Sequence, residues 1–239
     1  MADKVVPINP VIKHYNSEML NDLLRDVRQL PQRPYAEKKI YHTWFTYFAD
    51  LSSILSLIPC LRLKDGFALR AYAYFEAEGM NGDGDGIVWA MPEHVSLPEV
   101  PKTLRSKPPG ALNNIMEAIE GDGSLWSFMC ASVFFCGMSD FCLGGHMCTL
   151  ETGHIIANDF RQSPEETRSL DDFSWLETRP ANFEPEVKRA NNIITVTLHT
   201  YEDFVPGRLT RFVDVYNRGD YCFKREETVI AKDGGVMQL

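Results

Sequence analysis

The residues best suited to chemistry gather between Gly121 and Phe160. Thiols and imidazoles bind soft metal ions and attack electrophiles more readily than other side chains. Four of the six cysteines recur here at intervals of six residues, and two histidines lie within the same stretch: Cys130, Cys136, Cys142, Cys148, His146 and His154. A metal centre or a nucleophile would therefore be expected here before anywhere else in the chain.

The cysteine spacing leaves one compact set of metal ligands, Cys142, His146 and Cys148. On a helix, six residues turn through about 600°, so successive cysteines point about 120° apart and cannot share an ion. In a strand, His146 and Cys148 share a face with Cα atoms about 6.6 Å apart, which suits two ligands of one zinc ion. The alternative is that the thiols are buried and unreactive, because free cysteine is among the most buried residue types. We expect this alternative, with no resident cofactor.

Two predicted strands offer an acid–base site. In the strand that follows Cys148, side-chain alternation places His154 on one face and Glu151 and Asp159 on the other. The later strand 192–201 carries His199 on its polar face. If the two strands are neighbours, His154 and His199 converge as general base and acid, with Glu151 or Asp159 orienting them. The alternative is an ordinary solvated face of an antiparallel sheet.

The glycine-rich loop 81–86 resembles the start of a calcium-binding loop. It has oxygen-bearing side chains at its first, third and fifth positions and Gly86 at its sixth. The twelfth position, which requires a bidentate glutamate, is Pro92, and the flanking segments alternate like strands. We therefore interpret the loop as a hairpin connection whose glycines adopt positive φ. The motifs of serine hydrolases, P-loop NTPases and dinucleotide-binding folds are absent from the sequence.

Patterns of apolar residues predict the elements that position these side chains. The first helix is capped by Asn16 or Ser17 and closed by Pro31. A second helix is expected over 40–58, although the aromatic and β-branched residues of 40–48 also suit a strand. The remaining elements are a hairpin of strands 67–75 and 87–91, helices 111–120 and 124–141, and strands 146–160, 192–201, 209–216 and 221–231.

The predicted fold class is α+β, with helices packed on one face of a curved, mostly antiparallel sheet. The segment 125–141 is apolar on every side, so we expect it to form a buried helix at the centre of the core. The loop 92–110 contains five prolines and is the one candidate for a domain boundary. We nevertheless expect residues 1–239 to form a single domain.

The last predicted hairpin turns at Asn217–Asp220, where Gly219 supplies the positive φ that the turn needs. Asp214 and Arg225 then fall on one face of the hairpin and nearly opposite each other, with aromatic residues on either side. This face is either a stacking platform for a ligand or a ladder that stabilises the two strands.

Charge is unevenly distributed along the chain, whose formal net charge is −9. The segment 76–186 carries nineteen acidic and six basic side chains, whereas the flanking segments are slightly basic. This acidic centre repels phosphate backbones, so nucleic-acid binding is not expected. No run approaches the ~20 apolar residues of a membrane-spanning helix, and Met1–Pro10 lacks the apolar core of a secretory signal. We therefore expect a cytoplasmic protein with reduced cysteines and no membrane partner.

Two functions are consistent with these features. The first is a non-enzymatic cytoplasmic binding protein that engages a protein partner through its acidic central region. The second is a small-molecule enzyme of hydrolase or isomerase type that uses the His154–His199 pocket. The acidic centre and the proline-rich loop favour the first, and the polar sheet face favours the second.

Overall fold

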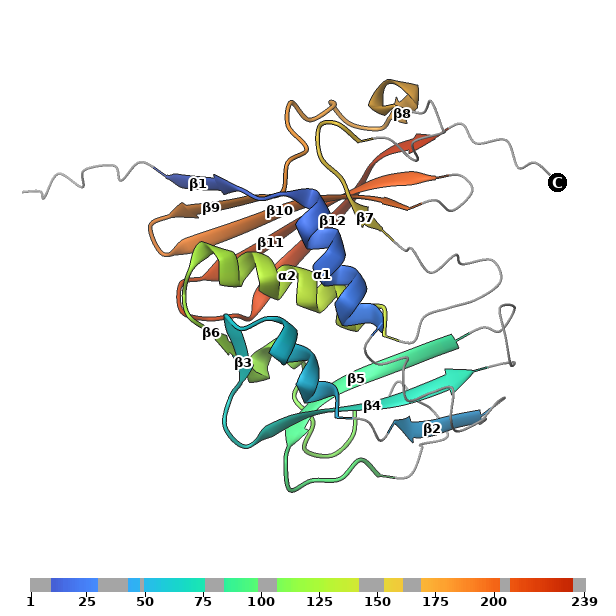
Figure 1. Ribbon diagram of the computed structural model, residues 1–239, viewed down its shortest axis with the longest axis vertical. Coiled ribbons are helices and arrows are strands. Elements are labelled where there is room, and N and C mark those ends of the chain that lie inside the picture. The colour runs from blue at the N-terminus through green and yellow to red at the C-terminus, as the bar shows by residue number, and fades with distance from the viewer. Residues whose placement is uncertain are drawn as a thin grey trace, which may run out of the picture.

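The computed structural model shows an α+β protein in which a curled antiparallel sheet covers two α-helices (Figure 1). The α+β class predicted from the sequence is therefore confirmed. The structure describes residues 10–29, 43–47, 50–75, 84–98, 107–141, 153–160, 169–202 and 207–233.

The large sheet has seven antiparallel strands in the order β1-β9-β10-β11-β12-β8, with β7 pairing beside β9 on the same edge of β10. Its centre is formed by β10, β11 and β12; the hairpin of β11 and β12 is the last hairpin that the sequence predicts, and Gly219 adopts a φ of +84° in its turn. The strands are β1 Val11–His14, β7 His154–Ile155, β8 Phe173–Trp175, β9 Glu186–Ala190, β10 Ile193–Glu202, β11 Arg208–Asn217 and β12 Phe223–Asp233.

Two α-helices pack on the inner face of the large sheet. Helix α1, Ser17–Gln29, begins where the Asn16 side chain accepts a hydrogen bond from the amide of Met19. Helix α2, Leu125–Ser139, begins at Ser124, whose hydroxyl accepts from the amide of Ser127. Because α2 is apolar on every side, it is buried between two layers, as predicted: it contacts β9 and β10 of the large sheet and β3 and β5 beyond it (Figure 1).

A smaller layer lies on the far side of the helices (Figure 1). It consists of an antiparallel sheet in the order β2-β4-β5 and a short pair, β3-β6. One buried apolar cluster includes residues of both layers and both α-helices. The elements are β2 Thr43–Tyr47, β3 Leu61–Leu63, β4 Phe67–Phe75, β5 Gly84–Pro92 and β6 Ile119–Gly121, with 3-10 helices η2 Leu51–Leu57, η3 Ile115–Ala118 and η4 Leu170–Asp172.

Two predicted helices are wrong. The helix expected over 40–58 is the strand β2 followed by η2, because aromatic and β-branched residues favour a strand and Asp50 caps a new turn by accepting from the amide of Ser52. The helix expected over 111–120 shrinks to η3, whose last residue leads directly into β6. Of the predicted strand 146–160, only β7 lies within the described residues as a strand, and 142–152 lies outside them.

A polar clamp attaches β7 to α1. The Asn21 side-chain amide donates to the carbonyl oxygen of Ile155 at 2.8 Å and accepts from the amide of Ile155 at 2.8 Å. The Asn21 side chain therefore provides the two backbone hydrogen bonds that a neighbouring strand would otherwise provide for Ile155. This clamp holds β7 against the helix and forms one wall of the cavity described next.

Candidate functional site

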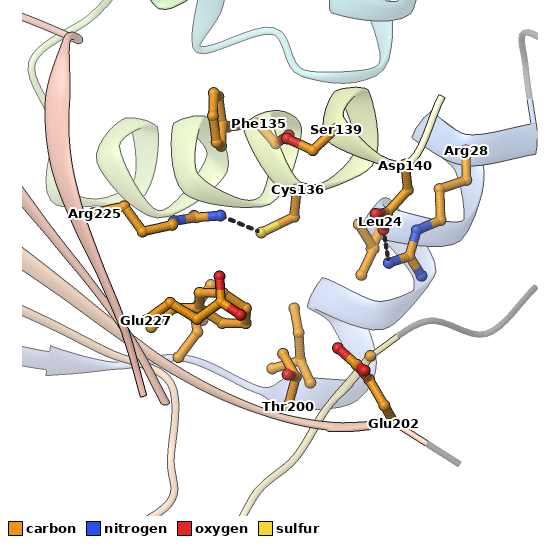
Figure 2. A pocket seen from close by; sticks show the side chains of 14 residues that line it. Leu24, Arg28, Phe135, Cys136, Ser139, Asp140, Thr200, Glu202, Arg225 and Glu227 are labelled. Carbon is orange, nitrogen blue, oxygen red and sulfur yellow. Dashed lines mark hydrogen bonds and ion pairs between the residues drawn. The ribbon is translucent and has the colours of Figure 1, made fainter. Parts of the chain in front are cut away.

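A cavity of ≈ 280 Å³ lies between the inner face of the large sheet and helices α1 and α2 (Figure 2). We call it the central cavity. Alternate residues of β10, β11 and β12 point into it, because side chains of a strand alternate between the two faces. Its apolar wall is formed by Leu24, Phe135, Ile155, Leu198 and Phe212.

Arg225 is fixed at one end of the central cavity. Its Nε and Nη2 donate to the two carboxylate oxygens of Asp214 at 2.7 and 2.6 Å, and Asp214 is 1% exposed. The guanidinium also lies over the rings of Phe135, Phe212 and Phe223, at 4.8 to 5.3 Å from their centroids. Burial alone would lower the pKa of Arg225, but the hydrogen bonds to Asp214 outweigh it and raise the pKa, so the guanidinium is charged.

The predicted pairing of Asp214 with Arg225 is thus confirmed, since the two residues are direct partners in the β11–β12 register. The pair also holds a thiol: Arg225 Nη1 donates to Cys136 Sγ at 3.3 Å across the cavity wall (Figure 2). Burial raises the pKa of Cys136, and Arg225 offsets only part of that rise. Cys136 is therefore a neutral thiol rather than a thiolate nucleophile.

The other described thiols also have shifted pKa values. A hydrogen bond between Cys60 and Cys130 lowers the pKa of Cys60 and raises that of Cys130, so Cys60 ionises first. Burial raises the pKa of Cys222 to about 11. Within the residues the structure describes, no group of three or more His, Cys, Asp and Glu side chains could hold a metal ion. The predicted ligands Cys142, His146 and Cys148 lie outside those residues, so the zinc alternative stays a prediction.

The opposite end of the central cavity presents an unsatisfied hydroxyl. Thr200 is 5% exposed, and its Oγ1 has no hydrogen-bond partner. Two charged pairs lie around it: Arg28 contacts Asp140 at 2.5 Å, and Glu202 contacts Arg208 at 2.5 Å. The exposed Glu227 also lines the cavity and is in no ion pair with the described residues. Figure 2 shows Thr200 and Glu202 on the sheet side of the cavity, across from Cys136 and Asp140. Thr200 is therefore a buried polar group of the lining that still needs a partner.

The outer face of the same sheet carries a second hollow, of ≈ 260 Å³. We call it the outer hollow. His199 lines it, is 3% exposed, and packs against the ring of Phe183 at 5.0 Å between centroids. Burial lowers the pKa of His199 to about 4, the Phe183 backbone partly opposes this, and Arg211 lowers the pKa further. The imidazole is therefore neutral at physiological pH.

The two strands that carry the predicted histidines are neighbours, because β7 pairs with β10 and the amide of Ile156 donates to the carbonyl oxygen of His199. His154 is exposed and lies opposite Tyr201 in the β7–β10 register, and it does not line the outer hollow. Asp159 is exposed just beyond β7, and Glu151 lies outside the described residues. The charged groups that line the hollow with His199 are instead Glu184, Glu186 and Arg211. The acid–base role of His154 and His199 stays a prediction.

The surfaces proposed for a protein partner are only partly described. Asp171 and Asp172 are exposed in η4, and His94 and Lys107 are exposed in the proline-rich segment. Partner binding through the acidic central region stays a prediction. Among the helices of the described part of the chain, none is long and apolar enough to span a membrane.

Comparison with protein-family models, with curated proteins and with solved structures gave no match. The functional argument therefore rests on the geometry of the described residues.

Proposed function

We propose that this protein binds a small, neutral, mainly apolar molecule in the central cavity through one hydrogen bond to Thr200. The buried Thr200 hydroxyl, which has no partner in an apolar cavity, is the observation that carries the proposal. Leaving a buried hydroxyl unsatisfied costs about 1–3 kcal/mol. Oγ1 has almost no accessible surface of its own, so a ligand with a hydroxyl or carbonyl group recovers that energy when the Thr200 side chain rotates towards the cavity.

The charges around the cavity favour a neutral ligand. Arg225 is paired with Asp214, Arg28 with Asp140, and Glu202 with Arg208. An anionic ligand would therefore lose its hydration without finding an uncommitted cation among these groups, and a cationic ligand would find only the carboxylate of Glu227, which is exposed to solvent. The volume of ≈ 280 Å³ is close to the lower end of the range of ~300–1,000 Å³ for ligand sites, so the ligand is small.

The chemistry of the lining favours binding over catalysis. Cys136 is the nucleophile nearest to Arg225, and burial raises its pKa, so it does not supply a thiolate. The apolar wall and the paired charges instead form a preorganised binding site in which few polar groups set the orientation.

Three probes with the same six-carbon chain test the proposal: hexan-1-ol, hexylammonium and hexanoate. We expect hexan-1-ol to bind more tightly than either ion in calorimetric titrations of the full chain. Thr200→Val keeps the shape of the side chain and removes the hydroxyl, so it should weaken hexan-1-ol binding about three- to tenfold. The proposal would be contradicted if either ion bound as tightly as hexan-1-ol. It would also be contradicted if Thr200→Val bound hexan-1-ol as tightly as the parent protein does.

A steric variant confirms the location. Leu24→Phe enlarges a side chain of the apolar wall and should abolish binding by filling the cavity. Leu23→Phe is the matched control, because Leu23 lies on the same helix and does not line the cavity. If both variants bind hexan-1-ol like the parent protein, the ligand binds elsewhere.

A further inference from the structure

Two cysteine thiols from different elements of the core meet beside the start of helix α2. Cys60 lies directly before β3 and is half-buried, and its carbonyl oxygen accepts a hydrogen bond from the amide of Asp122 at 3.1 Å. Asp122 belongs to the segment that leads from β6 into α2, so the backbone of Cys60 is fixed next to the helix.

Cys130 lies in the second turn of α2 and is 1% exposed. Its thiol is hydrogen-bonded to the thiol of Cys60. The strand β3 contacts α2, and Cys60 packs against the apolar cluster that includes Cys130 (Figure 1). The two sulfur atoms are therefore neighbours at the boundary between the smaller layer and α2, and we call the pair the core dithiol.

A buried hydroxyl without a partner lies beside the core dithiol. Tyr15 is 8% exposed, and its hydroxyl has no hydrogen-bond partner among the described residues. Its ring packs on that of Trp126 at 5.2 Å between centroids, and Trp126 lies one helical turn before Cys130 on the same face of α2. Burial, with smaller contributions from Cys130 and Cys60, raises the pKa of Tyr15 to about 12. The hydroxyl is therefore a protonated donor that still needs an acceptor near the sulfur atoms.

The two thiols differ in access and in acidity. Cys60 is half-buried, whereas Cys130 lies inside the core. The hydrogen bond with Cys130 lowers the pKa of Cys60, although burial and the carboxylate of Asp122 oppose it, and the same hydrogen bond and burial raise the pKa of Cys130. Cys60 is therefore the thiol that ionises first and that a small electrophile reaches from solvent, with the protonated Cys130 next to it.

We propose that the core dithiol is an oxidation site, at which hydrogen peroxide converts Cys60 and Cys130 into a disulfide. The thiolate of Cys60 attacks one peroxide oxygen and the O–O bond breaks, which leaves a sulfenic acid on Cys60 and releases hydroxide. The proton that Cys60 gave up converts this hydroxide to water, and the Tyr15 hydroxyl donates a hydrogen bond to the leaving oxygen.

The second step is internal to the core dithiol. The sulfur of Cys130 displaces the sulfenic hydroxyl of Cys60, which leaves with the Cys130 thiol proton as a second water. The two thiols together lose two electrons and two protons, and one hydrogen peroxide is reduced to two waters. The proposal does not depend on the central cavity or on its ligand.

Mass spectrometry of the full chain treated with hydrogen peroxide tests the proposal. We expect a disulfide between Cys60 and Cys130 that dithiothreitol reverses. Chymotryptic digestion identifies it, because cleavage at Phe134 and Phe135 separates Cys130 from the next cysteine. A disulfide between Cys60 and any other cysteine, or no disulfide at Cys60, would overturn the proposal.

The variant Cys130→Ala isolates the first step. Without its partner, Cys60 should stop at the sulfenic acid, which dimedone traps. Cys222 is the matched control in the same variant, because it is also half-buried and burial raises its pKa to about 11. Cys60 should be trapped at least about tenfold faster than Cys222, since a lower pKa increases the thiolate fraction more than it reduces the nucleophilicity. Equal rates would contradict the proposal.

Tyr15→Phe tests the hydrogen bond to the leaving oxygen. The variant keeps the ring that packs on Trp126 and removes only the hydroxyl. It should slow the oxidation of Cys60 several-fold and leave Cys130 as its disulfide partner. An unchanged rate would show that Tyr15 takes no part in the reaction. The hexan-1-ol titrations report on the central cavity, so either site can fail independently.

Discussion

The two faces of the large sheet are built from the same strands and have opposite chemistry. On the inner face, Leu198, Thr200 and Phe212 line a mainly apolar cavity whose charged groups, apart from the exposed Glu227, are paired. On the outer face, the intervening residues His199 and Arg211 line a polar hollow with surplus carboxylates. Successive side chains of β10 or β11 therefore alternate between a neutral environment on the inner face and an anionic one on the outer face.

This difference shows how a sheet can carry two environments without a separate scaffold for each. The inner face is largely buried because α1 and α2 cover it, and its buried charge Asp214 is held in a close pair. The outer face is covered in part by a second buried apolar cluster that includes Phe173 and Phe183, and the half-buried carboxylates of Glu184 and Glu186 line its open part. The comparison predicts that charge removal is costly on the inner face and tolerated on the outer one.

The largest expected effect comes from Arg225→Met. The substitution leaves Asp214 charged and buried, so we expect a loss of about 3–5 kcal/mol in the free energy of unfolding. Urea denaturation measures it. Arg62→Gln is the control, because it breaks the exposed ion pair with Glu120 and should cost less than about 1 kcal/mol. Equal losses in the two variants would mean that the Arg225–Asp214 pair behaves like an exposed ion pair and that the inner face is not shielded from water.

The next effect is the pH dependence from His199. Its pKa falls from 6.5 to about 4 on folding, so between these values the unfolded chain binds the extra proton. Stability therefore decreases as the pH falls from 6.5 towards 4, by an amount on the order of 2–3 kcal/mol. His199→Gln should remove that part of the slope in urea titrations at a series of pH values. If His199→Gln left the pH dependence of the free energy of unfolding unchanged, the imidazole of His199 would be exposed to solvent rather than buried.

A smaller effect is expected from Thr200→Val in the absence of ligand. Removing an unsatisfied hydroxyl from the inner face should stabilise the free protein by about 0.5–1 kcal/mol. Thr197→Val makes the same change at the outer hollow, where water satisfies the half-buried hydroxyl, and should not stabilise. Thermal unfolding of both variants measures the difference. Destabilisation by Thr200→Val would show that its hydroxyl already has a partner.

The smallest effect is one of rate. Cys60 should react with a maleimide faster than Cys136, because the pKa of Cys60 is lowered by Cys130 while burial raises that of Cys136. Mass spectrometry of peptides from partly labelled protein gives the order. If Cys136 were labelled faster than Cys60, its thiol would be reactive on the inner face, and a catalytic role of the central cavity would be supported.

Much of the fold follows from local pattern. The apolar stripe of α1, the uniformly apolar α2 and the alternation in β10, β11 and β12 were predictable, because each element buries a surface that its own residues define. The pairing of Asp214 with Arg225 was also predictable, since a short turn sets the register of its hairpin.

The sites were less accessible to sequence reasoning. The unsatisfied state of Thr200 depends on which side chains α1 and α2 bring over the sheet, and a strand pattern does not contain that information. Glu184 and Glu186 lie between the predicted strands 146–160 and 192–201, where no element was expected, so β9 and its pairing with β10 were not anticipated. The alternation of Glu184, Glu186 and Lys188 was the available signal, but short polar edge strands resemble loops.

A crystal structure of the protein grown with hexan-1-ol would show whether the central cavity binds a neutral ligand through Thr200. We expect the alkyl chain to lie against Leu198 and Phe212, with the alcohol oxygen about 2.7–2.8 Å from Thr200 Oγ1. An empty central cavity at a saturating alcohol concentration, or an alcohol bound with its oxygen turned away from Thr200, would contradict it.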